Sequence, residues 1–184
     1  MARRAIQARA EDVILDAAAG VLADRGEAAS MDDVATAAGV GRATVYRYFS
    51  SREALLDALL ARALTEVSER LAQAKLESVP VEEAVARIVR ALVAVGDRYM
   101  VLVCEEECLD KEMVERKVGG PVRAVFERGR ASGILRTDLS PDWLEELLGG
   151  LIAAGLKFAG EREFGVEETS AAIVSLFLDG ARTR

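Results

Sequence analysis

The 184-residue chain has no histidine, two cysteines and three prolines, and aromatic residues make up only 5% of it. Without histidine, mechanisms that need an imidazole base and metal sites with histidine ligands are excluded. The small numbers of prolines and aromatic residues favour helices over β-strands. Cys104 and Cys108 are close in sequence, so a bridge between them would close only a small loop. This spacing argues against a disulfide framework and for a reducing compartment.

Long hydrophobic runs are also missing. The longest charge-free apolar stretches, such as residues 147–156, reach about half of the roughly 20 residues that a membrane-spanning helix needs. Near the N-terminus, Arg9, Glu11 and Asp12 interrupt any apolar core of signal-peptide length. These absences predict a soluble, cytoplasmic protein with no membrane partner.

The charges are unevenly distributed along the chain. Lys and Arg number 24 against 31 Asp and Glu, a formal net charge of −7, and an acidic balance by itself argues against a nucleic-acid partner. Residues 1–52, however, hold seven basic and seven acidic side chains, so residues 53–184 carry the whole excess. The acidity therefore does not exclude DNA. With so few basic groups in residues 1–52, non-specific affinity for DNA would be weak and salt-sensitive. Any DNA binding would then depend heavily on Arg42, Arg47 and Arg52.

Apolar residues recur at helical spacing in almost every window, and no alternating strand pattern of useful length is present. The fold class is therefore predicted to be all-α. Gly26, Gly39, Pro80 and Gly133 are predicted to end or separate helices. The predicted helices cover residues 14–25, 31–38, 42–49, 51–76, 81–104, 110–130 with a kink at 119–121, 141–160 and 166–180.

Three helix starts carry capping signals. Ser30 with Asp33 is a variant of the capping box, and Ser50 with Glu53 is a full one. At 140–141 a serine suited to the N-cap precedes a proline suited to the first helical position. These signals predict where the second, fourth and seventh of the predicted helices begin.

Two short helices joined by the turn at residues 38–41 suggest a helix-turn-helix, in which the second helix enters the DNA major groove. On that second helix, Val45 and Phe49 fall on one side and are predicted to pack inward. Ala43, Thr44 and Arg47 lie opposite, with Arg42, Tyr46 and Tyr48 on the flanks. Arginine binds a guanine edge bidentately, threonine reaches a base or phosphate, and tyrosine hydroxyls bind phosphate. The pattern suits groove recognition.

Residues 14–59 closely resemble the DNA-binding domain of the tetracycline-repressor (TetR) family, above all in the hexamer Thr-Val-Tyr-Arg-Tyr-Phe at 44–49 followed by Arg52. The resemblance implies a three-helix DNA-binding domain at 1–52, joined by a long fourth helix to a helical effector-binding and dimerisation domain at 53–184. It also implies roles for individual side chains. Arg42, Thr44 and Arg47 would face the bases, and Tyr46, Tyr48 and Arg52 the DNA backbone. Ala43 would also belong to the DNA-binding surface.

Further charged residues near this domain are assigned by their positions. Asp32 and Asp33 stand at the start of the second helix, where they serve the helix dipole rather than DNA. Arg3, Arg4 and Arg9 are interpreted as a basic arm ahead of the first helix, which reaches the DNA backbone or the minor groove. The alternative is an ordinary solvated terminus.

The last two predicted helices are expected to form a dimer interface. The first contains three interior glycines, each of which costs about 1 kcal/mol relative to alanine, so a neighbouring backbone is expected to approach closely. The last helix is too apolar to face water on every side. The alternative is burial of both helices inside a monomer. The predicted interface residues are Leu147, Leu148, Leu151, Ile152, Gly155, Ile173, Leu176 and Phe177.

An effector pocket is predicted from adaptable and aromatic side chains in the C-terminal part, with ordinary core packing as the alternative. The candidates are Tyr99, Met100, Cys104, Met113, Phe126 and Trp143. No catalytic residue, metal site or cofactor is predicted. The sequence holds no nucleophile–base pair and no glycine-rich phosphate loop, which argues against an enzyme.

The leading functional hypothesis is a ligand-responsive transcriptional repressor. It would bind a palindromic double-stranded DNA operator as a homodimer on the nucleoid and be released by a small-molecule effector. The alternative is a constitutive DNA-binding protein of the same fold without an effector, and activation instead of repression stays open.

Overall fold

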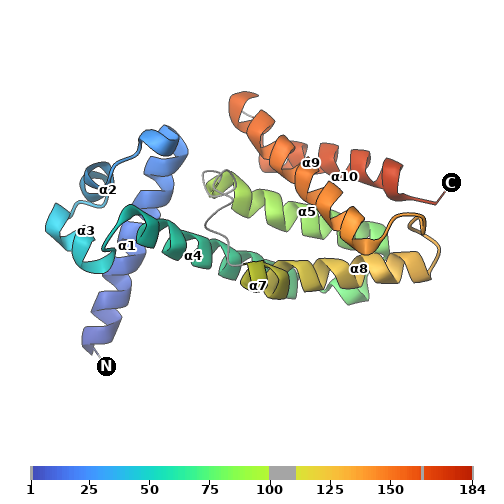
Figure 1. Ribbon diagram of the computed structural model, residues 1–184, viewed down its shortest axis with the longest axis horizontal. Helices are drawn as coiled ribbons and strands as arrows, with labels where there is room; N and C mark the ends of the chain where they lie inside the picture. Colours follow the sequence, from blue (N-terminus) through green and yellow to red (C-terminus); the bar gives the residue numbers. More distant parts are fainter. Residues whose placement is uncertain (1, 100–110, 163, 184) are drawn as a thin grey trace. The chain divides into compact units, whose positions relative to one another are not determined.

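The computed structural model describes residues 2–99, 111–162 and 164–183, and its regular elements there are helical, as predicted (Figure 1). The only β feature of the described residues is an isolated bridge between Leu135 and Arg182. No helix among these residues is long and apolar enough to cross a bilayer. The helices are α1 Ala2–Arg25, α2 Met31–Ala37, α3 Arg42–Tyr48, α4 Arg52–Gln73, α5 Val81–Arg98, α7 Lys111–Val114, α8 Gly120–Ala131, α9 Pro141–Arg162 and α10 Val166–Ala181.

The helix ends predicted at three glycines are confirmed by backbone geometry, whereas the helix predicted for 81–104 already ends at Arg98. Gly26, Gly39 and Gly133 follow α1, α2 and α8 with φ angles of 57°, 67° and 74°, a left-handed conformation that glycine adopts without steric cost. At the start of α9, the Ser140 hydroxyl accepts a hydrogen bond from the Trp143 backbone N–H at 3.3 Å. The kink predicted at 119–121 is a π-helical segment, Glu115–Gly119, that runs directly into α8.

Of the two predicted capping boxes, one is confirmed and one is wrong. The Ser30 hydroxyl accepts from the Asp33 backbone N–H at 3.2 Å, and the Asp33 carboxylate accepts from the Ser30 backbone N–H at 3.0 Å. Hydrogen bonds from Ser30 lower the pKa of Asp33. At α4, however, the hydroxyl that accepts from the Ala54 backbone N–H, at 3.2 Å, belongs to Ser51. Helix α4 begins at Arg52, so Ser51 rather than Ser50 occupies the N-cap.

The chain divides into two compact units. Unit 1 comprises residues 1–63 and 98–109, and unit 2 comprises residues 64–97 and 110–184. The predicted boundary after residue 52 coincides with the first turn of α4, but the compact unit includes more of that helix. Leu55 and Leu56 of α4 are buried and line a small space together with Leu22 and Met31. The first turns of α4 therefore complete the core of unit 1.

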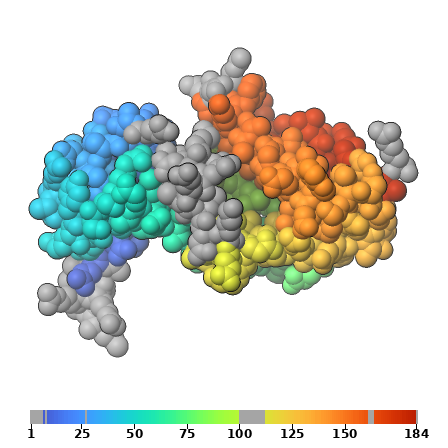
Figure 2. Space-filling view, viewed as in Figure 1, coloured from blue at the N-terminus to red at the C-terminus, as the bar shows by residue number. Residues whose placement is uncertain are grey.

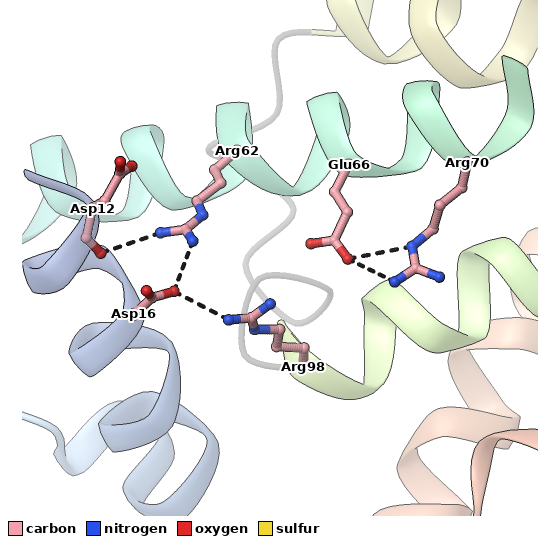
Figure 3. Close-up of polar contacts among 6 residues, drawn as sticks. All are labelled: Asp12, Asp16, Arg62, Glu66, Arg70 and Arg98. Carbon is pink, nitrogen blue, oxygen red and sulfur yellow. Dashed lines mark hydrogen bonds and ion pairs between the residues drawn. The ribbon is translucent and has the colours of Figure 1, made fainter. Parts of the chain in front are cut away.

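A shared carboxylate ties three segments of unit 1 together (Figure 3). Asp16 of α1 accepts hydrogen bonds from Arg62 of α4 at 2.7 Å and from Arg98, the last residue of α5, at 3.1 Å. Arg62 also donates to the backbone carbonyl of Asp12 at 3.3 Å. Because these side chains are partly exposed, each ion pair contributes at most about 1 kcal/mol. Together they link α1, the N-terminal half of α4 and Arg98 within unit 1.

Unit 2 is held together by close approaches between its helices. An added Cβ at Gly96 of α5 would overlap Leu156 of α9, and one at Gly155 of α9 would lie 2.7 Å from Ile173 of α10. The rings of Phe126 in α8 and Phe177 in α10 stack with centroids 5.5 Å apart. Interior side chains and glycines thus pack α5, α8, α9 and α10 into one core.

The position of the α4 cap can be tested by substitution. Replacing the capping hydroxyl in Ser51→Ala should lower the free energy of unfolding by about 1 kcal/mol, because the Ala54 backbone N–H loses its partner. The matched change Ser50→Ala, one residue earlier, should have a much smaller effect. Urea denaturation followed by circular dichroism measures both, and equal losses would contradict the assignment.

Candidate nucleic-acid interface

The two helices of the predicted helix-turn-helix are present, with the turn between them closed by backbone hydrogen bonds. The Val40 N–H donates to the Ala35 carbonyl at 3.0 Å, and Gly41 stands at the N-cap of α3 in an extended conformation. Val45 is fully buried and Phe49 is 4% exposed, so the predicted inward side of α3 is confirmed. These two side chains fix how α3 is rotated about its axis.

The opposite side of α3 carries the predicted recognition residues. Arg42, Ala43, Tyr46 and Arg47 are exposed, while Thr44 and Tyr48 are half-buried. The segment that contains α3, coloured cyan, lies at the molecular surface in Figure 2. The structure thus places all six residues on or beside one accessible face of a helix.

Both arginines of this face stack on tyrosines of the same helix. The Arg42 guanidinium carbon is 5.4 Å from the centroid of Tyr46, and that of Arg47 is 5.3 Å from the centroid of Tyr48. These distances are typical of cation–π contacts. Stacking leaves the edge of a planar guanidinium free to form the paired hydrogen bonds that recognise guanine.

The acidic residues at the start of α2 also contact arginines. Asp33, besides its capping role, lies 2.5 Å from Arg25, and Asp32 lies 3.0 Å from Arg42 of the recognition helix. The pairing of Asp32 with Arg42 was missed by the sequence reasoning, which assigned both acids to the helix dipole. The two residues are ten positions apart and lie on different helices. Helical periodicity, which relates residues three or four positions apart, therefore does not predict their contact.

The structure places the remaining predicted DNA-contacting residues in helices α4 and α1. Arg52 is half-buried at the first turn of α4 and lines the same small space as Leu55 and Leu56. Arg3, Arg4 and Arg9 belong to α1, which begins at Ala2. The predicted position of these arginines ahead of the first helix is therefore wrong, because alanine-rich sequence extends the helix through them. Their contact with DNA stays a prediction.

An exposed helix face with two stacked arginines, a threonine and tyrosines, fixed by buried anchors behind it, matches the geometry of a major-groove reader. Residues 14–59 match the protein family described as bacterial regulatory proteins, tetR family. Over 153 residues the chain is 37% identical to the HTH-type transcriptional repressor LfrR of Mycolicibacterium smegmatis, covering 82% of this chain and 79% of that protein. The chain belongs to the tetR family. The resemblance drawn from the recognition hexamer is confirmed.

Solved structures of tetR-family regulators share the fold along almost the whole chain. The crystal structure of the TetR-like regulator LfrR from Mycobacterium smegmatis in complex with proflavine has a TM-score of 0.76 and 29% identity, covering 96% of this chain and 99% of that chain. A tetR-family regulator from Marinobacter aquaeolei VT8 has a TM-score of 0.74 at 22% identity and covers both chains completely. At that lower identity the likeness shows the fold alone.

The residues predicted for the effector pocket are not brought into one described cavity. Tyr99 is buried, and its hydroxyl has no hydrogen-bond partner among the described residues, whereas Met100 and Cys104 lie outside those residues. Phe126 is fully buried in the core, Met113 is half-buried and Trp143 is 59% exposed. A hollow of about 570 Å³ in unit 2, between the C-terminal part of α4 and α8, was missed; it is lined by Ser68, Leu71, Ala72, Leu76, Glu77, Pro121, Ala124, Val125 and Arg128.

The predicted interface residues of α9 and α10 fall into two groups. Leu148, Ile152, Ile173 and Phe177 are buried within the chain itself, and Gly155 admits the side chain of Ile173 of the same chain. Leu147 and Leu176 are exposed and Leu151 is half-buried. A groove of about 460 Å³ between α9 and α10 adds Phe158 and Phe164, which the sequence reasoning missed.

The exposed side of α3, called the recognition face below, can be tested by substitution of its side chains. Arg47→Ala should lower the affinity for a specific duplex roughly 5- to 150-fold, since a bidentate base contact is worth about 1–3 kcal/mol. Tyr46→Ala should lower the affinity as well, because it removes a hydroxyl assigned to a phosphate and the ring on which Arg42 stacks. Ala37→Ser, an exposed position on α2, serves as a control that should bind normally. Electrophoretic mobility shifts measure the affinity and size-exclusion chromatography the oligomeric state. Unchanged affinity in both variants would contradict the assigned face.

Proposed function

We propose that this protein is a transcriptional repressor that binds a palindromic operator as a homodimer and is released by a small-molecule effector. The observation that carries the proposal is the face of α3, where Arg42 and Arg47 are exposed and stacked while Val45 and Phe49 hold the helix from behind. The proposed site of action is nucleoid DNA in the cytoplasm.

Repression is supported by the relative LfrR. LfrR is named a transcriptional repressor and aligns with this chain beyond the DNA-binding helices, over 153 residues. A tightly bound regulator that overlaps a promoter blocks transcription by occupancy alone. DNA binding through α3 would therefore repress transcription without any further activity.

A homodimer is supported by the exposed apolar surface of α9 and α10. Leu147, Phe158 and Leu176 are 46%, 52% and 66% exposed, and Gly149 and Gly150 leave open space above the α9 backbone. Part of α9, coloured orange, lies on the surface in Figure 2. A second copy placed on this surface would meet the same residues by two-fold symmetry. Two recognition helices would then occupy successive major grooves about one helical turn apart.

Release by an effector is supported by the relative crystallised with proflavine and by the buried hydroxyl of Tyr99, which has no hydrogen-bond partner within residues 2–99, 111–162 and 164–183. One observation favours the constitutive alternative. Phe126, predicted to line a pocket, is fully buried against Phe177, so that part of the core is filled by the chain itself.

The principal experiment is selection of bound duplexes from a random DNA pool by the purified protein. The expected result is a palindrome whose half-sites are centred about 10 base pairs, or a multiple of that, apart. Enrichment of no sequence above the starting pool would contradict the proposal. A site without two-fold symmetry would contradict its dimeric form.

Proflavine serves as the effector probe. Adding it should weaken binding of the selected duplex in a saturable way by roughly 5–150-fold, the usual range of coupling between two sites. Fluorescence anisotropy of labelled duplex measures the release, with a duplex-only titration as the control for intercalation. Operator binding that stays constant while proflavine binds the protein would favour the constitutive alternative.

The dimer surface is tested by Leu176→Glu. A buried carboxylate without a partner is costly, so the dimer dissociation constant should rise roughly tenfold or more. Ala171→Glu, exposed on α10 outside the groove, is the matched control and should leave association unchanged. Sedimentation equilibrium measures both, and equal association of the two variants would rule out this face.

A further inference from the structure

The two arginines of the recognition face differ in their surroundings. Arg42 is paired with a carboxylate, since its Nη1 lies 3.0 Å from Oδ2 of Asp32. Arg47 stacks on Tyr48, but no acidic side chain of the described residues pairs with it. One base-reading arginine is therefore tethered by an acid and the other is not.

Arg42 is held from two directions by separate elements. The Tyr46 ring, one turn further along α3, stacks at 5.4 Å from the guanidinium carbon, while Asp32 approaches from the first turn of α2. Helix α2 is itself fixed at its start by the capping box of Ser30 and Asp33. These two contacts therefore restrict the conformations that the Arg42 side chain adopts.

Asp32 has a second effect because of its charge. Its side chain is 58% exposed and Arg42 is 64% exposed, so both are accessible to a DNA duplex beside α3. The Asp32 carboxylate repels DNA phosphates. It also stays paired with Arg42 until an acceptor that binds the guanidinium more strongly displaces it. A guanine edge provides two aligned acceptors for a guanidinium, whereas random phosphates provide attraction that salt weakens.

We propose that Asp32 is a positioning residue that determines sequence specificity. It holds Arg42 in the direction of a base edge and reduces the attraction of the recognition face for arbitrary DNA. The inference rests on the proposed function, because it concerns how the same α3 face discriminates between duplexes. It assigns to Asp32 a part in recognition beyond the helix dipole.

The test compares Asp32→Asn with Asp24→Asn. The first removes the carboxylate charge while keeping the shape of the side chain. The second removes one charge from an exposed acid of α1 that has no ion pair among the described residues. Each protein is titrated with the duplex selected by the wild-type chain and with a shuffled duplex of equal length and composition, at several salt concentrations.

Asp32→Asn should bind the shuffled duplex roughly three- to tenfold more tightly at low salt. Its preference for the selected duplex should fall by roughly fivefold or more. Asp24→Asn should change both affinities less than about twofold, since isolated surface charges contribute little. A fresh selection with Asp32→Asn should recover half-sites that have lost their preference at one base pair and kept it at the others.

A double-mutant cycle separates positioning of Arg42 from general repulsion. In an Arg42→Ala background, Asp32→Asn should no longer change the ratio of selected to shuffled binding. In an Arg47→Ala background it should still do so. Matching unfolding curves of Asp32→Asn and the wild type exclude a folding defect as the cause.

The outcomes distinguish this inference from the proposed function. If the wild-type chain enriches no duplex, the proposed function fails. In that case, slowed rotation of the Arg42 guanidinium in NMR spectra of the free protein, abolished by Asp32→Asn, still tests the tether. If the wild type selects a site but Asp32→Asn behaves like Asp24→Asn, or still changes the ratio of selected to shuffled binding without Arg42, the inference about Asp32 is wrong.

Discussion

Burial of Val45 and Phe49 is the constraint on which the rest of the DNA-binding surface depends. Helix α3 has seven residues, and a helix of that length is not stable by itself in water. Its conformation and its rotation are both imposed by two apolar side chains held in the core of unit 1. Because of this, the exposure of Arg42 and Arg47 is a consequence of packing, and any change in those anchors would alter which residues reach DNA.

The structure shows that several basic side chains of unit 1 are paired with acids. Unit 1 has few basic side chains, and several of them are engaged with acids: Arg25 with Asp33, Arg42 with Asp32, and Arg62 and Arg98 with Asp16. A DNA-binding surface built this way has little electrostatic attraction to spare for arbitrary phosphates. Under the proposed function, discrimination between duplexes comes from the geometry of individual side chains, such as Arg42 beside Asp32.

Local patterns predicted most of the fold because they depend on neighbouring residues. Glycines marked the ends of α1, α2 and α8, and apolar periodicity identified the buried side of α3. One error came where two equivalent choices stood side by side. Ser50 and Ser51 are both competent caps, and the hydroxyl that serves depends on which residue leaves the extended conformation first. Residues ahead of Ile14 continue α1, since a helix does not end where its apolar stripe does.

The sequence by itself determined that the chain is helical and that its N-terminal part carries a recognition helix with a buried and an exposed side. Those properties follow from spacings of three and four residues. Only the tertiary structure decided which glycine of α9 admits a neighbour, since Gly155 meets Ile173 while Gly149 and Gly150 face open space. It alone also brought Asp32 to Arg42. Such contacts depend on how separate helices are oriented across a turn, and the periodicity of either helix carries no information about that orientation.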